Sequence, residues 1–116
     1  MRILVVDDEP QVLEVAKQLF EALGCYVATA ASGREALAFL ARVPDVMLVF
    51  SDVHMPEMTG FELADEIRRR RPDLRVVLTS GNHADKGRAG TAVMPKPWRL
   101  TDIEAVVIAT RAAGPQ

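Results

Sequence analysis

Short apolar segments alternate along the chain with longer segments of helical periodicity. The apolar segments lie at residues 3–6, 26–28, 46–50, 76–79 and 92–94. Uninterrupted apolar runs of this length are typical of strands that are buried on both faces of a sheet. Strands that alternate with helices predict an α/β fold, in which a parallel sheet is covered by helices on both faces.

The helical segments carry start and stop signals. The first helix is expected at about residues 10–23, with Pro10 in its first turn and Gly24 directly after its end. Its apolar stripe is formed by Val12, Val15, Leu19 and Leu23. Capping boxes predict where three further helices start, namely Ser32…Glu35, Thr59…Glu62 and Thr101…Glu104.

The segment 82–91 breaks this alternation. It contains Gly87 and Gly90 and no large apolar residue, so at most one frayed helical turn is expected there. A fold of five alternating strands would otherwise place its fourth helix in this segment. We therefore expect the fourth helix to be short or absent.

Composition limits the function classes. The 116 residues have the length of one domain, and residues 1–116 are expected to form it. A net charge of −2 does not indicate direct nucleic acid binding, which is typical of basic domains. Cys25 is the single cysteine, so an internal disulfide is excluded. No apolar run is long enough for membrane insertion, and the first residues turn acidic too early for a signal peptide. A cytoplasmic location is therefore expected.

Polar residues follow the predicted strands. These residues are acidic, hydroxyl-bearing or basic: Asp7, Asp8, Glu9, Ser51, Asp52, Thr79, Ser80 and Lys96. Sites in open parallel sheets lie beyond the carboxyl ends of the strands, so these side chains are expected to share one rim.

Two interpretations of the acidic residues are open. They could only cap the first helix, whose N-terminus favours acids. Alternatively, Mg²⁺ could offset the repulsion between neighbouring carboxylates, which is roughly 4 kcal/mol at about 4 Å and an effective dielectric near 20. Asp52 at a neighbouring strand end favours the cation. A carboxylate near Mg²⁺ and a lysine can attack a phosphoryl group, with Lys96 neutralising charge and Ser80 donating a hydrogen bond. Taken singly, Lys96 would be a surface residue and Ser80 a turn residue.

A set of fragments resembles the receiver domain of two-component response regulators. They are Leu4-Val5-Val6-Asp7-Asp8-Glu9, Asp52-Val53-His54-Met55-Pro56 with Gly60, Thr79-Ser80-Gly81, and Lys96-Pro97. Each fragment is modest alone, but together they cover almost the whole chain in the right order. The resemblance implies a flavodoxin-like, doubly wound sheet of five parallel strands in the order 2-1-3-4-5.

The resemblance also implies roles for single residues. Asp52 would accept a phosphoryl group from a histidine kinase or a phosphotransfer protein. The ligands of Mg²⁺ would be Asp7, Asp8, Asp52 and the backbone carbonyl of His54. Ser80 stands in the place of the switch hydroxyl. Lys96 stands in that of the phosphate-contacting lysine, with a cis bond to Pro97.

Two features depart from the family's pattern. Val93 stands where the family has an aromatic switch residue, three positions before Lys96, and Ser80 lies only sixteen residues before Lys96. The usual signalling face is therefore in question, and ordering of residues 82–91 on phosphorylation is an alternative switch. Receivers with a short fourth helix resemble stand-alone regulators and the receivers of hybrid kinases.

Other side chains carry less information. His54 and Asn82 occupy positions that, by resemblance, tune how fast the phosphate leaves, and both His54 and His83 are expected to be exposed. Trp98 is expected to pack at the start of the last helix or to mark a docking spot. Cys25 is expected to be a buried, inert thiol.

The expected function is a phosphorylation-activated signalling switch with slow self-dephosphorylation, and not a metabolic enzyme. A Mg²⁺-dependent phosphatase resembling the haloacid dehalogenase group is one alternative. Such enzymes have a second Asp two residues after the nucleophile, and His54 occupies that position here. A receiver-like scaffold that is not phosphorylated is another alternative, although a scaffold would have no need to keep the polar residues that follow the strands. The sequence names neither the kinase nor the downstream protein target, and it is compatible with a homodimer. No effector domain follows, so the chain is either a complete regulator or a piece of a longer protein.

Overall fold

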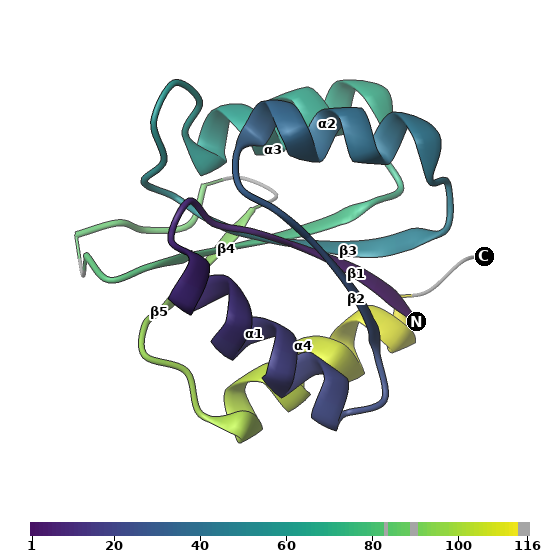
Figure 1. Ribbon diagram of the computed structural model, residues 1–116, viewed down its shortest axis with the longest axis vertical. Helices are drawn as coiled ribbons and strands as arrows, with labels where there is room; N and C mark the ends of the chain where they lie inside the picture. Colours follow the sequence, from purple (N-terminus) through teal and green to yellow (C-terminus); the bar gives the residue numbers. More distant parts are fainter. Residues whose placement is uncertain (83, 89–90, 114–116) are drawn as a thin grey trace.

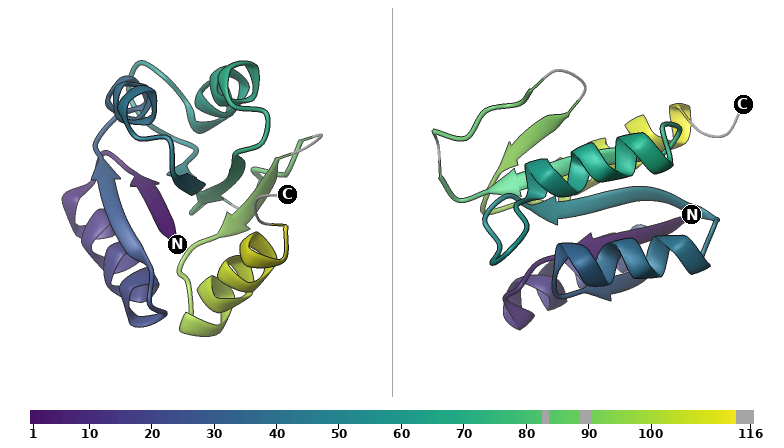
Figure 2. Two further views of the ribbon diagram at one scale, coloured as in Figure 1. Left: turned by 90° about the vertical axis from the view of Figure 1, so that its right-hand side faces the viewer. Right: turned by 90° about the horizontal axis from the view of Figure 1, so that it is seen from above.

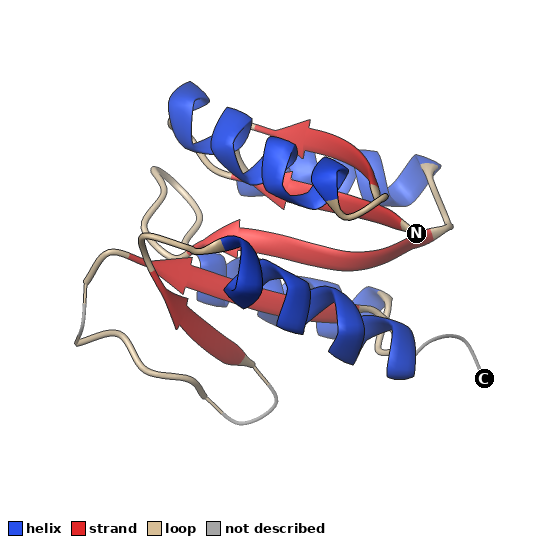
Figure 3. Ribbon diagram, turned by 90° about the horizontal axis from the view of Figure 1, so that it is seen from below, coloured by secondary structure: helices blue, strands red, loops and turns tan. Residues whose placement is uncertain are grey.

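The computed structural model describes residues 1–82, 84–88 and 91–113, and its five strands form one parallel sheet in the order β2-β1-β3-β4-β5. The strands are β1 (Arg2–Val6), β2 (Tyr26–Ala30), β3 (Val46–Asp52), β4 (Arg75–Ser80) and β5 (Ala92–Pro95). Each lies where the apolar pattern predicts it. The flavodoxin-like topology predicted from the resemblance is confirmed, and the strand arrowheads in Figure 3 point to the same end of the sheet.

Helices cover both faces of this sheet. They are α1 (Pro10–Ala22), α2 (Gly33–Arg42), α3 (Gly60–Arg70) and α4 (Leu100–Ala112). Helices α1 and α4 lie on one face, and α2 and α3 lie on the other (Figure 1). The end-on view in Figure 2 (left) shows the sheet between the two pairs. None of the helices in the described part of the chain is long and apolar enough to cross a membrane.

A hydrophobic core lies on each face of the sheet. Under α1 and α4, Phe20 packs edge-on against Phe50 at a centroid distance of 5.3 Å. Under α2 and α3, Leu63 and Ile67 of α3 pack against the side chains of the central strands that point to this second face. Burial on both faces holds for the central strands β1, β3 and β4. It does not hold for the edge strand β2, where Tyr26 is 70% exposed.

Two details of the predicted helices are wrong. Val15 is 51% exposed and does not belong to the face of α1 that packs on the sheet. That face is centred on Ala16 and Phe20, which are buried. The Thr101…Glu104 box does not start α4, which begins at Leu100. The backbone N–H of Arg99 donates to Asp102 Oδ2 at 2.9 Å, so the acid that satisfies this end comes two residues earlier than predicted.

The other predicted capping residues are confirmed. The Ser32 hydroxyl accepts from the backbone N–H of Glu35 at 3.1 Å at the start of α2. Thr59 and Glu62 form a reciprocal box at the start of α3. These caps satisfy backbone N–H groups that have no partner within the helix.

The segment between β4 and β5 has no helix in its described residues 81–82, 84–88 and 91. It holds a turn in which the Asp85 N–H donates to the Asn82 carbonyl at 3.1 Å, and an isolated bridge between Arg88 and Thr91. The guanidinium of Arg88 also lies 3.7 Å from the ring centroid of Phe61 on α3. The predicted shortening of the fourth helix therefore agrees with the described residues, while the prediction for His83 falls outside them.

Candidate functional site at the carboxyl ends of the strands

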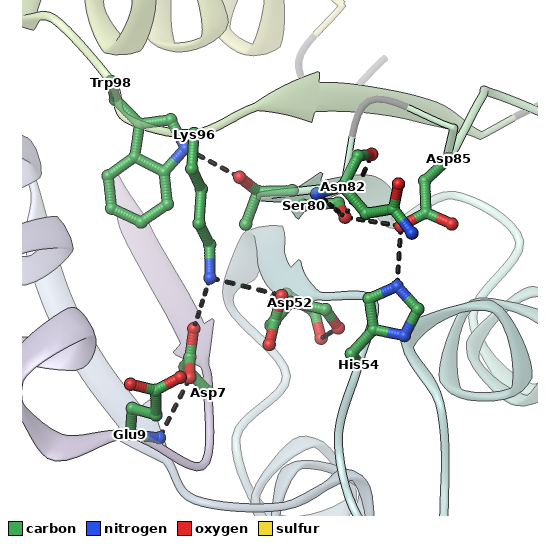
Figure 4. A network of polar contacts seen from close by, with 11 residues as sticks. Asp7, Glu9, Asp52, His54, Ser80, Asn82, Asp85, Lys96 and Trp98 are labelled. Atoms are coloured by element: carbon green, nitrogen blue, oxygen red, sulfur yellow. Dashed lines mark hydrogen bonds and ion pairs between the residues drawn. The ribbon is translucent and has the colours of Figure 1, made fainter.

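Side-chain alternation along the strands decides which polar residues meet. Val5, Phe50 and Val77 point into the core under α1 and α4. Because side chains alternate with a period of two, Asp7, Asp52 and Thr79 continue the same face just beyond that core. Ser80, one residue after Thr79, turns towards the opposite face. One apolar pattern therefore creates two adjoining groups of polar side chains (Figure 4).

The first group is acidic. Asp7, Asp8 and Asp52 each offer a carboxylate oxygen, and these oxygens all lie within 4.8 Å of one another. Asp7 and Asp52 are buried, whereas Asp8 is exposed. Asp7 also accepts the backbone N–H of Glu9 at 2.9 Å, while the Glu9 side chain makes no capping bond to α1. The acidic residues therefore do more than cap the first helix.

Lys96 lies between two of these carboxylates. Its ammonium nitrogen Nζ is 3.2 Å from Asp7 Oδ2 and 3.2 Å from Asp52 Oδ1, and only 21% of its side chain is exposed. Burial by itself would lower the pKa of Lys96, but the two carboxylates outweigh burial and the pKa is raised. Lys96 is therefore a charged member of the cluster and not a free surface lysine.

Within this cluster, Asp52 has a pKa above its ordinary value. Its burial raises its pKa, Lys96 counteracts this increase, and the negative charge of Asp7 adds to it, so that the net direction is upwards. Burial favours the neutral form of a carboxyl group, as does a neighbouring carboxylate. An anionic Asp52 is thus a costly group for this fold to hold.

The segment that carries Lys96 is anchored by Trp98. The indole N–H donates to the Thr79 hydroxyl at 2.7 Å, and the indole ring meets Phe50 edge-on at a centroid distance of 5.3 Å. The Lys96–Pro97 bond is cis, as the resemblance implied. Trp98 is half-buried and packs before α4, which confirms its predicted structural place.

Gly60 sets the distance between α3 and the end of β3. A Cβ atom at Gly60 would overlap with the carbonyl oxygen of Asp52 and would lie 3.0 Å from Val53 Cα. The Gly60 N–H donates to the Val53 carbonyl at 2.8 Å. Only glycine permits this approach, so Gly60 helps to place Asp52.

The second polar group is formed by Ser80, Asp85 and His54. The Ser80 hydroxyl donates to Asp85 Oδ2 at 2.5 Å, and His54 Nε2 lies 2.7 Å from the same oxygen. The hydrogen bond from Ser80 and then the contact with His54 lower the pKa of Asp85, so it is an anion. His54 is 61% exposed, as predicted, but it is paired. Sequence reasoning missed Asp85, because nothing in its glycine-rich segment marks it.

Comparison with known proteins gives the family. Residues 3–106 match the family model described as the response regulator receiver domain. The chain belongs to this family. Response regulator SaeR of Staphylococcus aureus (strain USA300) is 35% identical over 72 residues. That match covers 62% of this chain and 31% of SaeR, so the chain aligns with less than a third of that relative.

Solved receiver structures share the fold. The response regulator TrrA of Thermotoga maritima, in complex with Mg²⁺–BeF, is 31% identical with a TM-score of 0.83, over 94% of this chain and 97% of TrrA. The receiver domain of the hybrid histidine kinase CckA is 32% identical with a TM-score of 0.81, over 95% and 98% of the two chains. The polar cluster described above is thus the candidate site of a receiver domain.

Proposed function

We propose that this receiver domain is a signalling switch that accepts a phosphoryl group on Asp52. The observation that carries the proposal is the cluster itself, in which a buried carboxylate lies 3.2 Å from Lys96 and shares one space with Asp7 and Asp8. Lys96, which already lies beside Asp52, is placed to neutralise negative charge on a phosphoryl group bonded to that residue. The related TrrA structure, which contains Mg²⁺–BeF, supports this assignment.

The donor set fits Mg²⁺. It consists of hard carboxylate oxygens that lie within 4.8 Å of one another, two from buried residues and one from exposed Asp8. Mg²⁺ prefers such oxygens and usually keeps several waters. Asp7, Asp8 and Asp52 would hold the ion in this proposal, together with the backbone carbonyl of His54. When bound, Mg²⁺ neutralises the negative charge of the transferring phosphoryl group.

The chain's own residues perform the transfer. A carboxylate oxygen of Asp52 attacks phosphorus, an acyl phosphate bond forms, and the bond from phosphorus to the donor's leaving group breaks with its electron pair. Lys96 stabilises the negative charge on a phosphoryl oxygen. The Ser80 hydroxyl donates a hydrogen bond to another. Loss of the group is slow hydrolysis by water, with His54 and Asn82 at the edge of the site.

The partners follow from this chemistry. A histidine kinase or a phosphotransfer protein supplies the phosphoryl group in this proposal, and a downstream protein recognises the phosphorylated form. Residues 1–116 act as one receiver unit in the cytoplasm, whether or not they belong to a longer chain. A homodimer is compatible with this role.

Intact-protein mass spectrometry tests the proposal. The chain is incubated with acetyl phosphate, with and without Mg²⁺, next to Asp52→Asn. We expect one phosphoryl adduct that requires Mg²⁺, is absent from the variant and decays slowly after the donor is removed. No adduct and no calorimetric Mg²⁺ binding would favour a scaffold, and continuous turnover of a phosphate ester would favour a phosphatase.

A further inference from the structure

We infer that Asp85 competes with the phosphoryl group for the hydroxyl of Ser80. Asp85 is thus a positioning residue that determines how tightly the phosphorylated state is held. This inference rests on the proposed function of Asp52 and adds a residue that acts through Ser80.

The hydroxyl of Ser80 is already engaged. It donates to Asp85 Oδ2 at 2.5 Å and accepts from the backbone N–H of Asn82 at 3.0 Å. Its other acceptor, the Asn82 carbonyl, is 3.5 Å away and therefore weaker. A serine hydroxyl has one proton, so it cannot donate to Asp85 and to a phosphoryl oxygen at the same time.

Asp85 is held in place by the far side of the site. The oxygen that accepts from Ser80 also lies 2.7 Å from His54 Nε2, and only 17% of the Asp85 side chain is exposed. His54 lies two residues after Asp52, so one carboxylate oxygen joins the β3 end to the β4 end (Figure 4). Hydrogen bonds to charged groups are stronger than neutral ones, so this is a real competitor for the Ser80 proton.

Charge adds to the competition. Asp85 is an anion, and a phosphoryl group on Asp52 brings further negative charge to the neighbouring strand end. For Ser80 to hold the phosphoryl oxygen, its hydroxyl must turn from one anion to the other. The described residues 84–88 lose that tie to β4 when it does. The exchange that completes the phosphoryl site therefore removes one of the two contacts that hold Asp85 Oδ2 and leaves the contact with His54.

Binding of beryllofluoride, a stand-in for the phosphoryl group, tests the inference. Its affinity in the presence of Mg²⁺ is measured by calorimetry for wild type, Asp85→Ala, Ser80→Ala and the double variant. Loss of one charge-assisted hydrogen bond corresponds to a change of about tenfold, so Asp85→Ala should bind about tenfold more tightly than wild type. In the Ser80→Ala background the same change should alter affinity by about twofold or less, because only the charge term remains. Asp85→Asn, which keeps an acceptor but not the charge, should lie between.

The controls separate the possible failures. Asp73→Ala removes the same charge from an exposed residue before β4 and should leave the affinity unchanged. If wild type binds beryllofluoride but Asp85→Ala binds no more tightly, the competition is refuted while the proposed function stands. An equal gain in the presence and absence of the Ser80 hydroxyl also refutes it, because charge alone would explain the gain. If wild type does not bind beryllofluoride, both proposals fall.

Discussion

Replacing Asp52 with Asn should stabilise this protein in the absence of Mg²⁺. At an effective dielectric of about 20, the pair with Lys96 at 3.2 Å is worth about 5 kcal/mol. Repulsion from Asp7, whose oxygen lies within 4.8 Å, costs at least about 3.5 kcal/mol on the same scale. The exposed Asp8 adds a smaller, screened repulsion. These terms nearly cancel, so the cost of burying the anion decides the outcome.

Asn fills the space of Asp without its charge, and Lys96 keeps its partner Asp7 at 3.2 Å. No buried charge is therefore left alone, and we expect a gain of about 1–2 kcal/mol in the free energy of unfolding. The assay is urea denaturation followed by circular dichroism at neutral pH with a chelator. Asp73→Asn is the matched control at an exposed position, and it should change stability by less than about 0.5 kcal/mol.

The pH dependence gives an independent check. Because the folded chain holds the pKa of Asp52 above its ordinary value, the folded state keeps this proton to a higher pH than the unfolded state does. Wild type should therefore lose stability relative to Asp52→Asn as the pH rises through that interval, and the two should converge below about pH 4. An Asp52→Asn protein that is equally or less stable at neutral pH would refute this reasoning.

Three other changes have expected outcomes. Gly60→Ala should cost about 1–3 kcal/mol in urea unfolding and slow phosphorylation, because its Cβ overlaps with the backbone of Asp52; unchanged values would contradict the close approach. Asp102→Ala should destabilise the chain at neutral pH. The hydrogen bond from the Arg99 backbone N–H is the main cause of the lowered pKa of Asp102, so the difference in thermal stability between wild type and variant should disappear as the pH falls below that pKa. A difference that persists in acid would count against this cap. Trp98→Phe should cost about 1–2 kcal/mol in urea unfolding, because it removes a 2.7 Å hydrogen bond; a neutral result would assign that bond no net value.

The sheet and its acidic rim could be predicted because both follow from local pattern. Apolar runs mark strands, parallel strands bring their carboxyl ends to one edge, and the residues that follow the runs must therefore meet. Asp7, Asp52 and Lys96 are far apart in the sequence, yet they form ion pairs as this argument requires.

The rest depends on contacts that no local pattern encodes. Asp85 reaches Ser80 from a segment without periodicity, so no local sequence pattern indicates that contact. The start of α4 at Leu100 was missed because Arg99 is not a capping residue type, and only the backbone geometry shows that Asp102 serves it. The Val15 error arose because a stripe of apolar residues indicates a helix but does not settle which of two adjacent faces meets the sheet.

Chemical mapping of the phosphorylated residue tests the central proposal most directly. The chain is treated with acetyl phosphate and Mg²⁺, reduced with borohydride so that an aspartyl phosphate becomes homoserine, and digested for peptide mass spectrometry. We predict homoserine at Asp52 and unmodified aspartate at Asp7 and Asp8. Reduction at Asp7 or Asp8, or at no aspartate while an intact adduct is present, would contradict the assignment of Asp52 as the acceptor.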